Sequence, residues 1–134
     1  MTLLLPCAAA ALSVPDVRGD EWTGRMSPDI TNLGIEDGLS QSSVLCAVQD
    51  TLGFMWFGTE DGLNRYDGSE FTVYRKTAGS SDGLSDTYIL SLCQDTSGGN
   101  YFLWVGTRDG GLNRLDRTTG RIRRYIPPDT GSIG

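Results

Sequence analysis

The stretch Asp37-Gly38-Leu39-Ser40 recurs as Asp82-Gly83-Leu84-Ser85, and Gln49-Asp50-Thr51 recurs as Gln94-Asp95-Thr96 at the same offset of 45 residues. Further along, Trp56-Phe57-Gly58-Thr59 is repeated as Trp104-Val105-Gly106-Thr107, and Gly62-Leu63-Asn64-Arg65 as Gly111-Leu112-Asn113-Arg114. The offset grows to 48 and then to 49 residues, so the insertions lie between the matching blocks and leave the blocks intact. Insertions confined to turns are typical of a repeat that is built from strands.

Each repeat has the pattern of four short strands. In the first repeat they cover residues 44–49, 54–58, 63–66 and 71–74, and glycine or aspartate marks every junction. A period of 45 to 50 residues predicts an all-β fold, a partial β-propeller of two four-stranded antiparallel blades over residues 30–134. We expect blades at 37–81 and 82–128, packed face to face, and the start of a third blade at 129–134. Residues Ile30 to Ile35 are expected to form a lone strand ahead of the first blade.

The composition excludes several classes of chemistry. The 134 residues contain no histidine, which removes imidazole bases and phosphohistidine formation. The net charge of −6 is spread along the chain, so no nucleic-acid partner is expected. Cys7, Cys46 and Cys93 show no C-x-x-C spacing, which argues against a zinc site. Cys46 and Cys93 occupy alternating strand positions, and we expect two small buried hydrophobes without a disulfide between them.

The N-terminus has the character of an export signal. Residues 3–14 form an uncharged run rich in leucine and alanine, too short for a membrane span but about as long as a signal-peptide core. We therefore predict a signal-peptide-like segment at 1–13 and a linker at 14–29. Cys7 follows a proline and is a poor lipoprotein site.

Several polar residues invite a functional interpretation, and each also has a structural one. Oxygen-rich side chains recur at short spacing and raise the question of calcium, but aspartate and asparagine beside glycine are typical of turns, which we favour. The residues concerned are Asp61, Asn64 and Asp67, with Asp109, Asn113 and Asp116 in the second repeat. Asp50 and Asp95 could pair as glycosidase carboxylates, but because they are repeat equivalents, one turn-capping role explains both.

The tryptophans and arginines of the repeat also have both a functional and a structural interpretation. Trp56 and Trp104 suit sugar stacking, but each lies in the middle of a short strand, which favours buried packing. Arg65 and Arg114 follow asparagine in the third strand, where an ion-paired or solvated strand face is the ordinary interpretation and an anionic ligand the alternative.

The quoted blocks closely resemble the repeat of the two-component regulator propeller family. The resemblance is carried by EDGLSQ (36–41), VQD (48–50), GFMWFGT (53–59) and DGLNRYDG (61–68), and the second repeat matches as well. It implies the sensor region of a bacterial hybrid two-component or related signalling protein, of which this chain is expected to be an N-terminal fragment. In that family the propellers precede a membrane helix, and kinase or cyclase domains follow it inside the cell.

These observations predict an extracytoplasmic or periplasmic ligand-sensing propeller without enzyme activity of its own. No catalytic, cofactor-binding or metal-binding residue is predicted, and no cofactor is expected. The expected partners are a carbohydrate or other small extracellular ligand and further blades of the intact protein, with self-association through exposed blade faces. Two alternatives remain open: a propeller-type carbohydrate-active enzyme, and a structural or adhesion repeat.

Overall fold

A computed structural model describes residues 30–128 of the chain. The chain divides into two units, residues 1–32 and 33–134, and both repeats lie in the second unit. The expected signal-peptide-like segment (1–13), linker (14–29) and third-blade start (129–134) lie outside the described residues. No helix within 30–128 is both long and apolar enough to cross a membrane.

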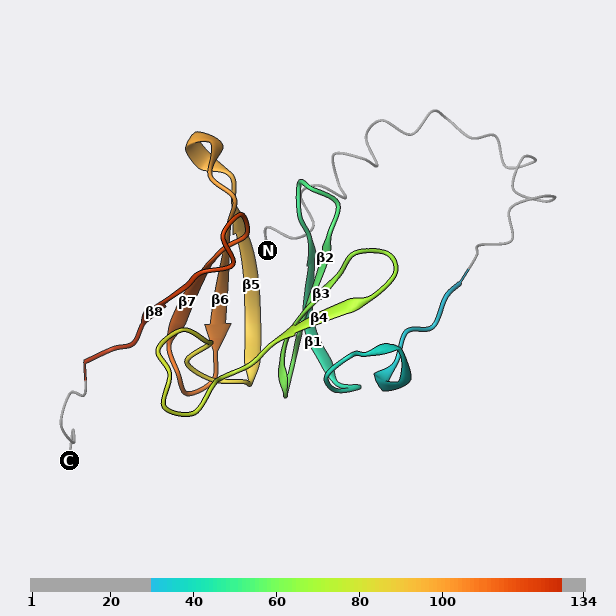
Figure 1. Ribbon diagram of the computed structural model, residues 1–134, viewed down its shortest axis with the longest axis horizontal. Coiled ribbons are helices and arrows are strands. Elements are labelled where there is room, and N and C mark those ends of the chain that lie inside the picture. The colour runs from blue at the N-terminus through green and yellow to red at the C-terminus, as the bar shows by residue number, and fades with distance from the viewer. Residues whose placement is uncertain (1–29, 129–134) are drawn as a thin grey trace, which may run out of the picture. The chain divides into compact units, whose positions relative to one another are not determined.

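The first repeat forms one antiparallel sheet of four strands in chain order. The strands are β1 (Val44–Gln49), β2 (Met55–Thr59), β3 (Gly62–Tyr66) and β4 (Phe71–Tyr74). Figure 1 shows this sheet in turquoise to yellow-green. Because each connection is a tight turn, each strand pairs with the strand that precedes it. The expected four-stranded blade is confirmed, and its strand bounds agree with the predicted ones to within one residue.

The second repeat builds an equivalent sheet. Its strands are β5 (Ile89–Asp95), β6 (Phe102–Thr107), β7 (Leu112–Asp116) and β8 (Ile122–Tyr125), again paired in chain order. The longer β5–β6 connection contains a short 3-10 helix, η4 (Ser97–Gly99), and extends past the neighbouring hairpins (Figure 1). Both sheets carry a register shift at the same place, between Val44 and Cys46 and between Ile89 and Ser91. The repeat therefore extends to local irregularities of the backbone.

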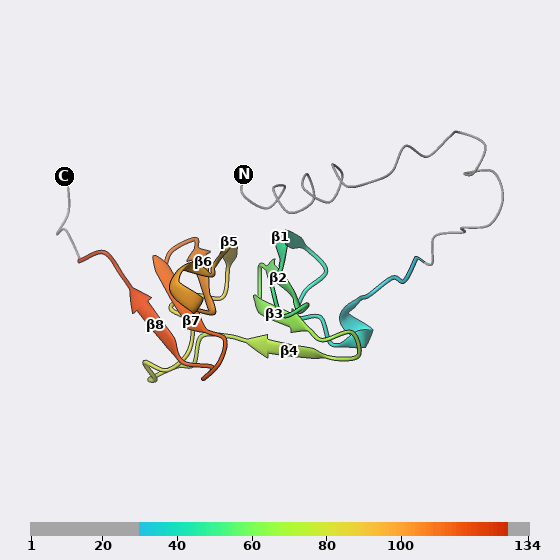
Figure 2. The same ribbon diagram turned by 90° about the horizontal axis from the view of Figure 1, so that it is seen from above.

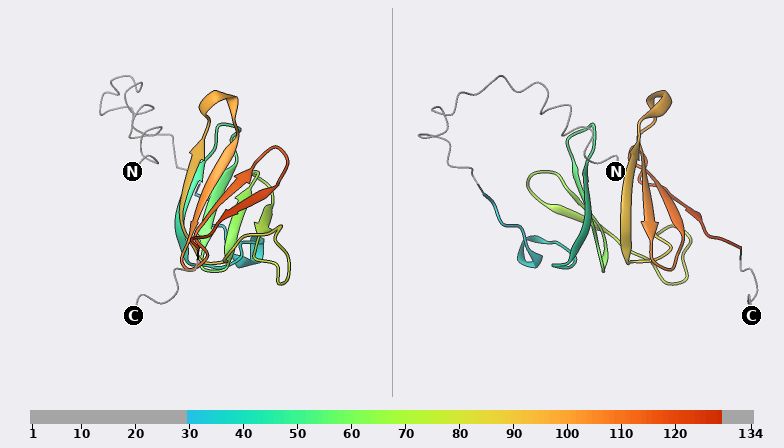
Figure 3. Two further views of the ribbon diagram at one scale, coloured as in Figure 1. Left: turned by 90° about the vertical axis from the view of Figure 1, so that its left-hand side faces the viewer. Right: turned by 180° about the vertical axis from the view of Figure 1, so that it is seen from behind.

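The core lies mainly between the two sheets. Strand β5 packs against β1 and β2, and the strands of the two sheets lie side by side in two views (Figures 2 and 3). The close approach needs a residue without a side chain at position 58. A Cβ atom on Gly58 would stand only 2.6 Å from Cγ2 of Ile89. The fully buried apolar side chains include Trp56, Leu63, Leu84, Ile89, Leu103, Val105 and Leu115.

The prediction of a lone strand over Ile30 to Ile35 is wrong. Residues 30–34 have no regular secondary structure, and the chain then forms a 3-10 helix, η3 (Ile35–Asp37). The Asp37 carboxylate accepts a hydrogen bond from the backbone N–H of Gly34 at 2.9 Å, which bends the segment back on itself. The segment that follows then packs its apolar side chain Leu39 into the protein.

Candidate functional site

Two buried asparagines hold the segment that leads into each blade. Asn64 Oδ1 accepts a hydrogen bond from the backbone N–H of Ser40 at 2.9 Å, and Asn64 Nδ2 donates to the Ser40 hydroxyl at 2.8 Å. Asn113 makes the same two bonds to Ser85, at 3.0 and 2.8 Å. The sequence pattern favours a turn role for these asparagines and does not predict their bonds to serine. The signal was present, because the Ser and Asn blocks are repeated together.

Asp50 caps its turn, as expected, and its carboxylate also contacts a tryptophan and an arginine. Its Oδ1 accepts hydrogen bonds from the backbone N–H groups of Leu52 and Phe54 at 2.9 and 3.1 Å. Its Oδ2 accepts one from the indole Nε1 of Trp56 at 2.8 Å. The same oxygen lies 2.8 Å from Nη1 of Arg117, which belongs to the other blade. With these partners on a fully buried carboxylate, Asp50 is unsuited to proton transfer with a substrate.

The aspartates considered for calcium serve turns instead. Asp67 Oδ1 accepts the backbone N–H groups of Ser69 and Glu70, and these bonds, that from Glu70 first, lower the pKa of Asp67. Asp116 does the same for Thr119 and Thr118, with the same effect on its pKa. Within residues 30–128, no cluster of three or more acidic, cysteine or histidine side chains could hold a metal ion.

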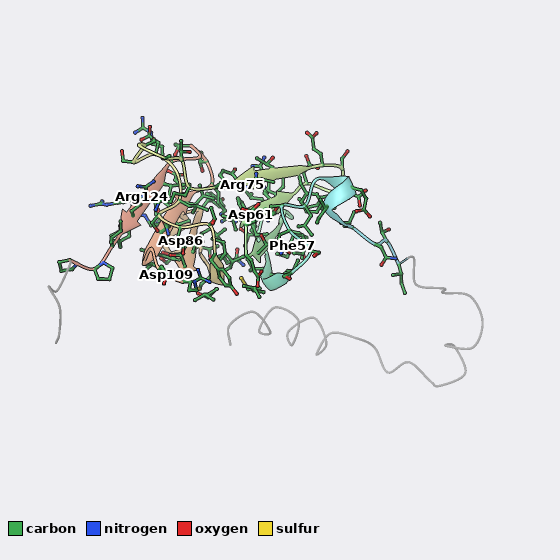
Figure 4. The ribbon with its side chains drawn as sticks, turned by 90° about the horizontal axis from the view of Figure 1, so that it is seen from below. Phe57, Asp61, Arg75, Asp86, Asp109 and Arg124 are labelled. Atoms are coloured by element: carbon green, nitrogen blue, oxygen red, sulfur yellow. The ribbon has the colours of Figure 1, made fainter. Side chains whose placement is uncertain are left out.

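Two separate polar pairs involve the β2–β3 and β6–β7 turns, and Figure 4 labels the four residues that form them. Asp61 pairs with Arg75 at 3.0 Å, with both side chains about half exposed. Asp86 Oδ2 accepts the backbone N–H of Asp109 at 3.0 Å. Partial burial of Asp86 acts to raise its pKa, but the backbone N–H groups of Asp109, Tyr88 and Thr87 outweigh that effect and lower it. In each pair the two groups bind each other, so turn structure explains these residues better than a ligand does.

The repeated arginines stack on aromatic rings. The guanidinium carbon of Arg65 lies 4.9 Å from the centre of the Phe54 ring, and that of Arg114 lies 4.3 Å from Phe102 and 5.8 Å from Trp104. Neither arginine forms a salt bridge among the described residues. In both blades, cation–π stacking takes the place of the ion pairs that were expected for these arginines.

Of the tryptophans and cysteines that we expect to be buried, only Trp56 is fully so, whereas Cys46 is half-buried. Trp56 is 1% exposed, as expected for a core residue, whereas Trp104 is half-buried. Cys46 is a free thiol whose pKa is raised by burial, an effect only partly offset by a backbone hydrogen bond with Gly58. Cys93 is also free but exposed, so its assignment as a buried hydrophobe is wrong. The reason is that the face of the second blade that carries Cys93 and Trp104 has no second sheet on it in the described chain.

A cavity of about 310 Å³ opens on this second blade. Its lining contains Phe102, Arg114, Asp116, Arg121, Ile122 and Arg123. Three arginines face one carboxylate, so the lining carries an excess of positive charge. The volume lies at the small end of the range of small-molecule sites, roughly 300–1,000 Å³. The cavity is suited to a small ligand that carries negative charge.

The comparison with known proteins agrees with the repeat geometry. The family described as "Two component regulator propeller" matches residues 38–61, which run from the first Asp-Gly-Leu-Ser motif to the β2–β3 turn. The chain also resembles the extracellular domain of a hybrid two-component system from B. thetaiotaomicron, with 35% identity and a TM-score of 0.65. Residues 38–61 of this chain therefore carry a two-component regulator propeller repeat. The blades of the chain are of the kind found in that extracellular domain.

The relatives that the chain matches are much longer than the chain itself. The structural match covers 71% of this chain and 13% of the B. thetaiotaomicron extracellular domain. A histidine kinase, P4, from Formosa agariphila is 51% identical over 49 residues, which is 37% of this chain and 4% of that kinase. The likeness therefore concerns the propeller repeats and not the whole proteins.

The contacts of two further arginines were not predicted from the sequence, because neither residue has an arginine at the equivalent position of the first repeat. Arg124 binds the connection between the blades: its Nε donates to the carbonyl of Gly83, and its Nη2 donates to those of Ser80 and Leu84. Arg117 crosses to Asp50 of the first blade. A comparison of the two repeats does not reveal such positions, because it identifies only the residues that both repeats have in common.

Proposed function

We propose that this chain is the recognition part of an extracytoplasmic sensor of a two-component system, and that it binds a small extracellular ligand, best a carbohydrate that carries negative charge. Its likeness to an extracellular domain of a hybrid two-component system carries the proposal. Kinase or other output would be supplied by other domains of the signalling protein.

The arginine-lined cavity supports an acidic ligand. Phe102, Arg114 and Asp116 have counterparts in the first blade (Phe54, Arg65 and Asp67), and their contacts are explained by stacking and turn capping. Arg121 and Arg123 differ, because the first blade has Glu70 and Thr72 in their places. Their charges serve no contact with an acidic side chain among the described residues. Guanidinium groups beside an aromatic ring suit a carboxylated or sulfated sugar.

The test is titration calorimetry of the chain with matched neutral and acidic oligosaccharides. We expect saturable binding of an acidic sugar, and loss of that binding in the double variant Arg121→Ala/Arg123→Ala. Arg108→Ala is the control, since Arg108 is an exposed arginine that pairs with Asp109 away from the cavity. Equal binding by both variants, or no preference for acidic sugars, would contradict the assignment of the cavity.

The enzyme alternative predicts a different result. A glycosidase or lyase would release new sugar ends during the same incubation, and an Asp50→Asn or Asp95→Asn variant would abolish the release. Such turnover would replace the sensor proposal by a catalytic one. The contacts of Asp50 argue against it, because its carboxylate is buried and engaged by Leu52, Phe54 and Trp56. A purely structural repeat would show neither sugar binding nor sugar cleavage.

A further inference from the structure

The two blades present the same face in two different environments. We call it the downstream face; in blade 1 (residues 37–81) it carries Val48, Trp56 and Gly58. Val48 pairs with Trp56 across β1 and β2, and Gly58 is two residues further along β2, so all three lie on one side of the sheet. Ile89 of blade 2 (residues 82–128) lies against Gly58. The downstream face of blade 1 is therefore covered by blade 2.

The equivalent face of blade 2 is open. Leu63 in blade 1 is 0% exposed, whereas its repeat equivalent Leu112 is 40% exposed. Val48 is 7% exposed, and its equivalent Cys93 is exposed. These pairs occupy the same strand positions, so the difference reflects the presence or absence of a covering sheet rather than a different local fold.

A buried ion pair joins blade 1 to the sheet that covers it. Asp50 ends the downstream face of β1, and Arg117 lies in the β7–β8 turn of blade 2, with Nη1 2.8 Å from Asp50 Oδ2. The side chain of Asp50 is 0% exposed and that of Arg117 is 2% exposed. Arg117 Nη1 forms no hydrogen bond, so its contact with Asp50 acts through charge. Arg117 Nε donates a hydrogen bond to the carbonyl of Tyr101. Buried charges are tolerated when they are paired, which ties blade 1 to a neighbour that supplies this arginine.

Blade 2 repeats the acidic half of this pair without the arginine. Asp95 is the equivalent of Asp50, and Trp104 is the equivalent of Trp56. Asp95 accepts hydrogen bonds from the backbone N–H and the hydroxyl of Ser97, at 2.9 and 2.6 Å. Among the described residues it forms no salt bridge. The open face therefore ends in an aspartate at the position where blade 1 receives its arginine.

We propose that the downstream face of blade 2 is a docking surface for another blade of this repeat, selected by an arginine in its third turn that binds Asp95 as Arg117 binds Asp50. The arginine directly follows the aspartate that ends the third strand, as Arg117 follows Asp116. The first blade of a second copy does not meet this requirement, because Gly68 follows Asp67 there. Charge complementarity thus specifies which blade follows which, and the inference does not depend on the proposed ligand.

The thiol of Cys93 reports directly on whether the face is covered. The chain is extended after residue 128 by a second copy of residues 82–128, with every cysteine except Cys93 replaced by serine. We expect a thiol reagent to react with Cys93 about tenfold more slowly than in the unextended chain with the same replacements. Replacing the copy's equivalent of Arg117 by glycine, or Asp95→Asn, should restore the faster rate. Equal protection with and without the arginine, or no protection by either extension, overturns the proposal.

A second measurement uses the existing interface and does not depend on folding of the extended chain. Val48→Cys places a thiol at the position equivalent to Cys93, in a chain whose other cysteines are serine. We expect this thiol to be protected, and Arg117→Gly to raise its rate of modification about tenfold. Arg121→Gly is the control, since Arg121 is exposed and contacts no residue of blade 1 by hydrogen bond or ion pair. An unchanged rate in Arg117→Gly shows that the arginine does not select the covering blade.

Discussion

Asn64 shows how one side chain replaces a whole strand partner. The segment before β1 has no sheet to pair with, and the buried amide of Asn64 supplies an acceptor and a donor to Ser40 in its place. The Asn64 side chain is fully buried and its two bonds to Ser40 are partly buried, so water replaces them poorly if the amide is removed. Asn113 repeats the arrangement with Ser85. The Asp-Gly-Leu-Ser motif and the asparagine of the third strand are therefore one structural unit.

We expect Asn64→Ala to lower the free energy of unfolding by about 1–3 kcal/mol, because it leaves the Ser40 N–H without its acceptor. Urea unfolding of the full chain, followed by tryptophan fluorescence, measures this change. The matched control is Asn100→Ala: Asn100 is exposed and makes no side-chain hydrogen bond among the described residues, so this change should cost little. Equal losses in the two variants would show that the Asn64 bonds contribute little.

At the scale of the element, the hairpins depend on glycines for two separate reasons. Gly53 in the β1–β2 turn has φ +93°, and a Cβ atom there would meet nothing within 4 Å. Gly62, the first residue of β3, has φ +135°, and a Cβ atom there would lie 2.8 Å from the carbonyl oxygen of Tyr74. The first glycine is needed for its backbone angle only. The second is needed for its angle and for the close approach of β4.

The pair Gly53→Ala and Gly62→Ala separates these effects. Gly53→Ala should cost about 1–2 kcal/mol from the left-handed backbone conformation of a residue with a side chain. Gly62→Ala should cost at least about 1 kcal/mol more, since the contacted atom belongs to the backbone and cannot rotate away. Thermal or urea unfolding of the two variants at the same concentration gives the comparison. Similar losses would mean that β4 moves aside and that the close approach is not required.

At the scale of the whole molecule, the parts predicted from sequence are those set by local spacing. The strands could be placed to within a residue because turns of glycine and aspartate separate apolar runs in both repeats. Contacts between distant residues were out of reach. Ser40 meets Asn64, and Asp50 meets Arg117, through pairings that no periodicity encodes. The exposure of Cys93 also depends on what covers its sheet, a property of the assembly rather than of the strand.

The open face of blade 2 should also govern the behaviour of the chain in solution. Leu90 and Leu112 are 49% and 40% exposed on β5 and β7, and apolar sheet surface of this kind favours association. A second copy can cover the face, but since its first blade has Gly68 where an arginine is required, Asp95 would remain unpaired. We therefore expect weak association, in which the mass from light scattering rises with concentration.

Leu112→Lys tests whether this face causes the association. The lysine places a charge on the open face, so the mass should stay close to that of one chain over the same concentration range. Leu52→Lys is the control, because Leu52 is 55% exposed but lies in the β1–β2 turn of the other blade. A concentration-independent monomer for the unmodified chain would show that two blades are sufficient in solution. Equal suppression by both lysines would place the contact elsewhere, since only Leu112 belongs to the face that another blade would cover.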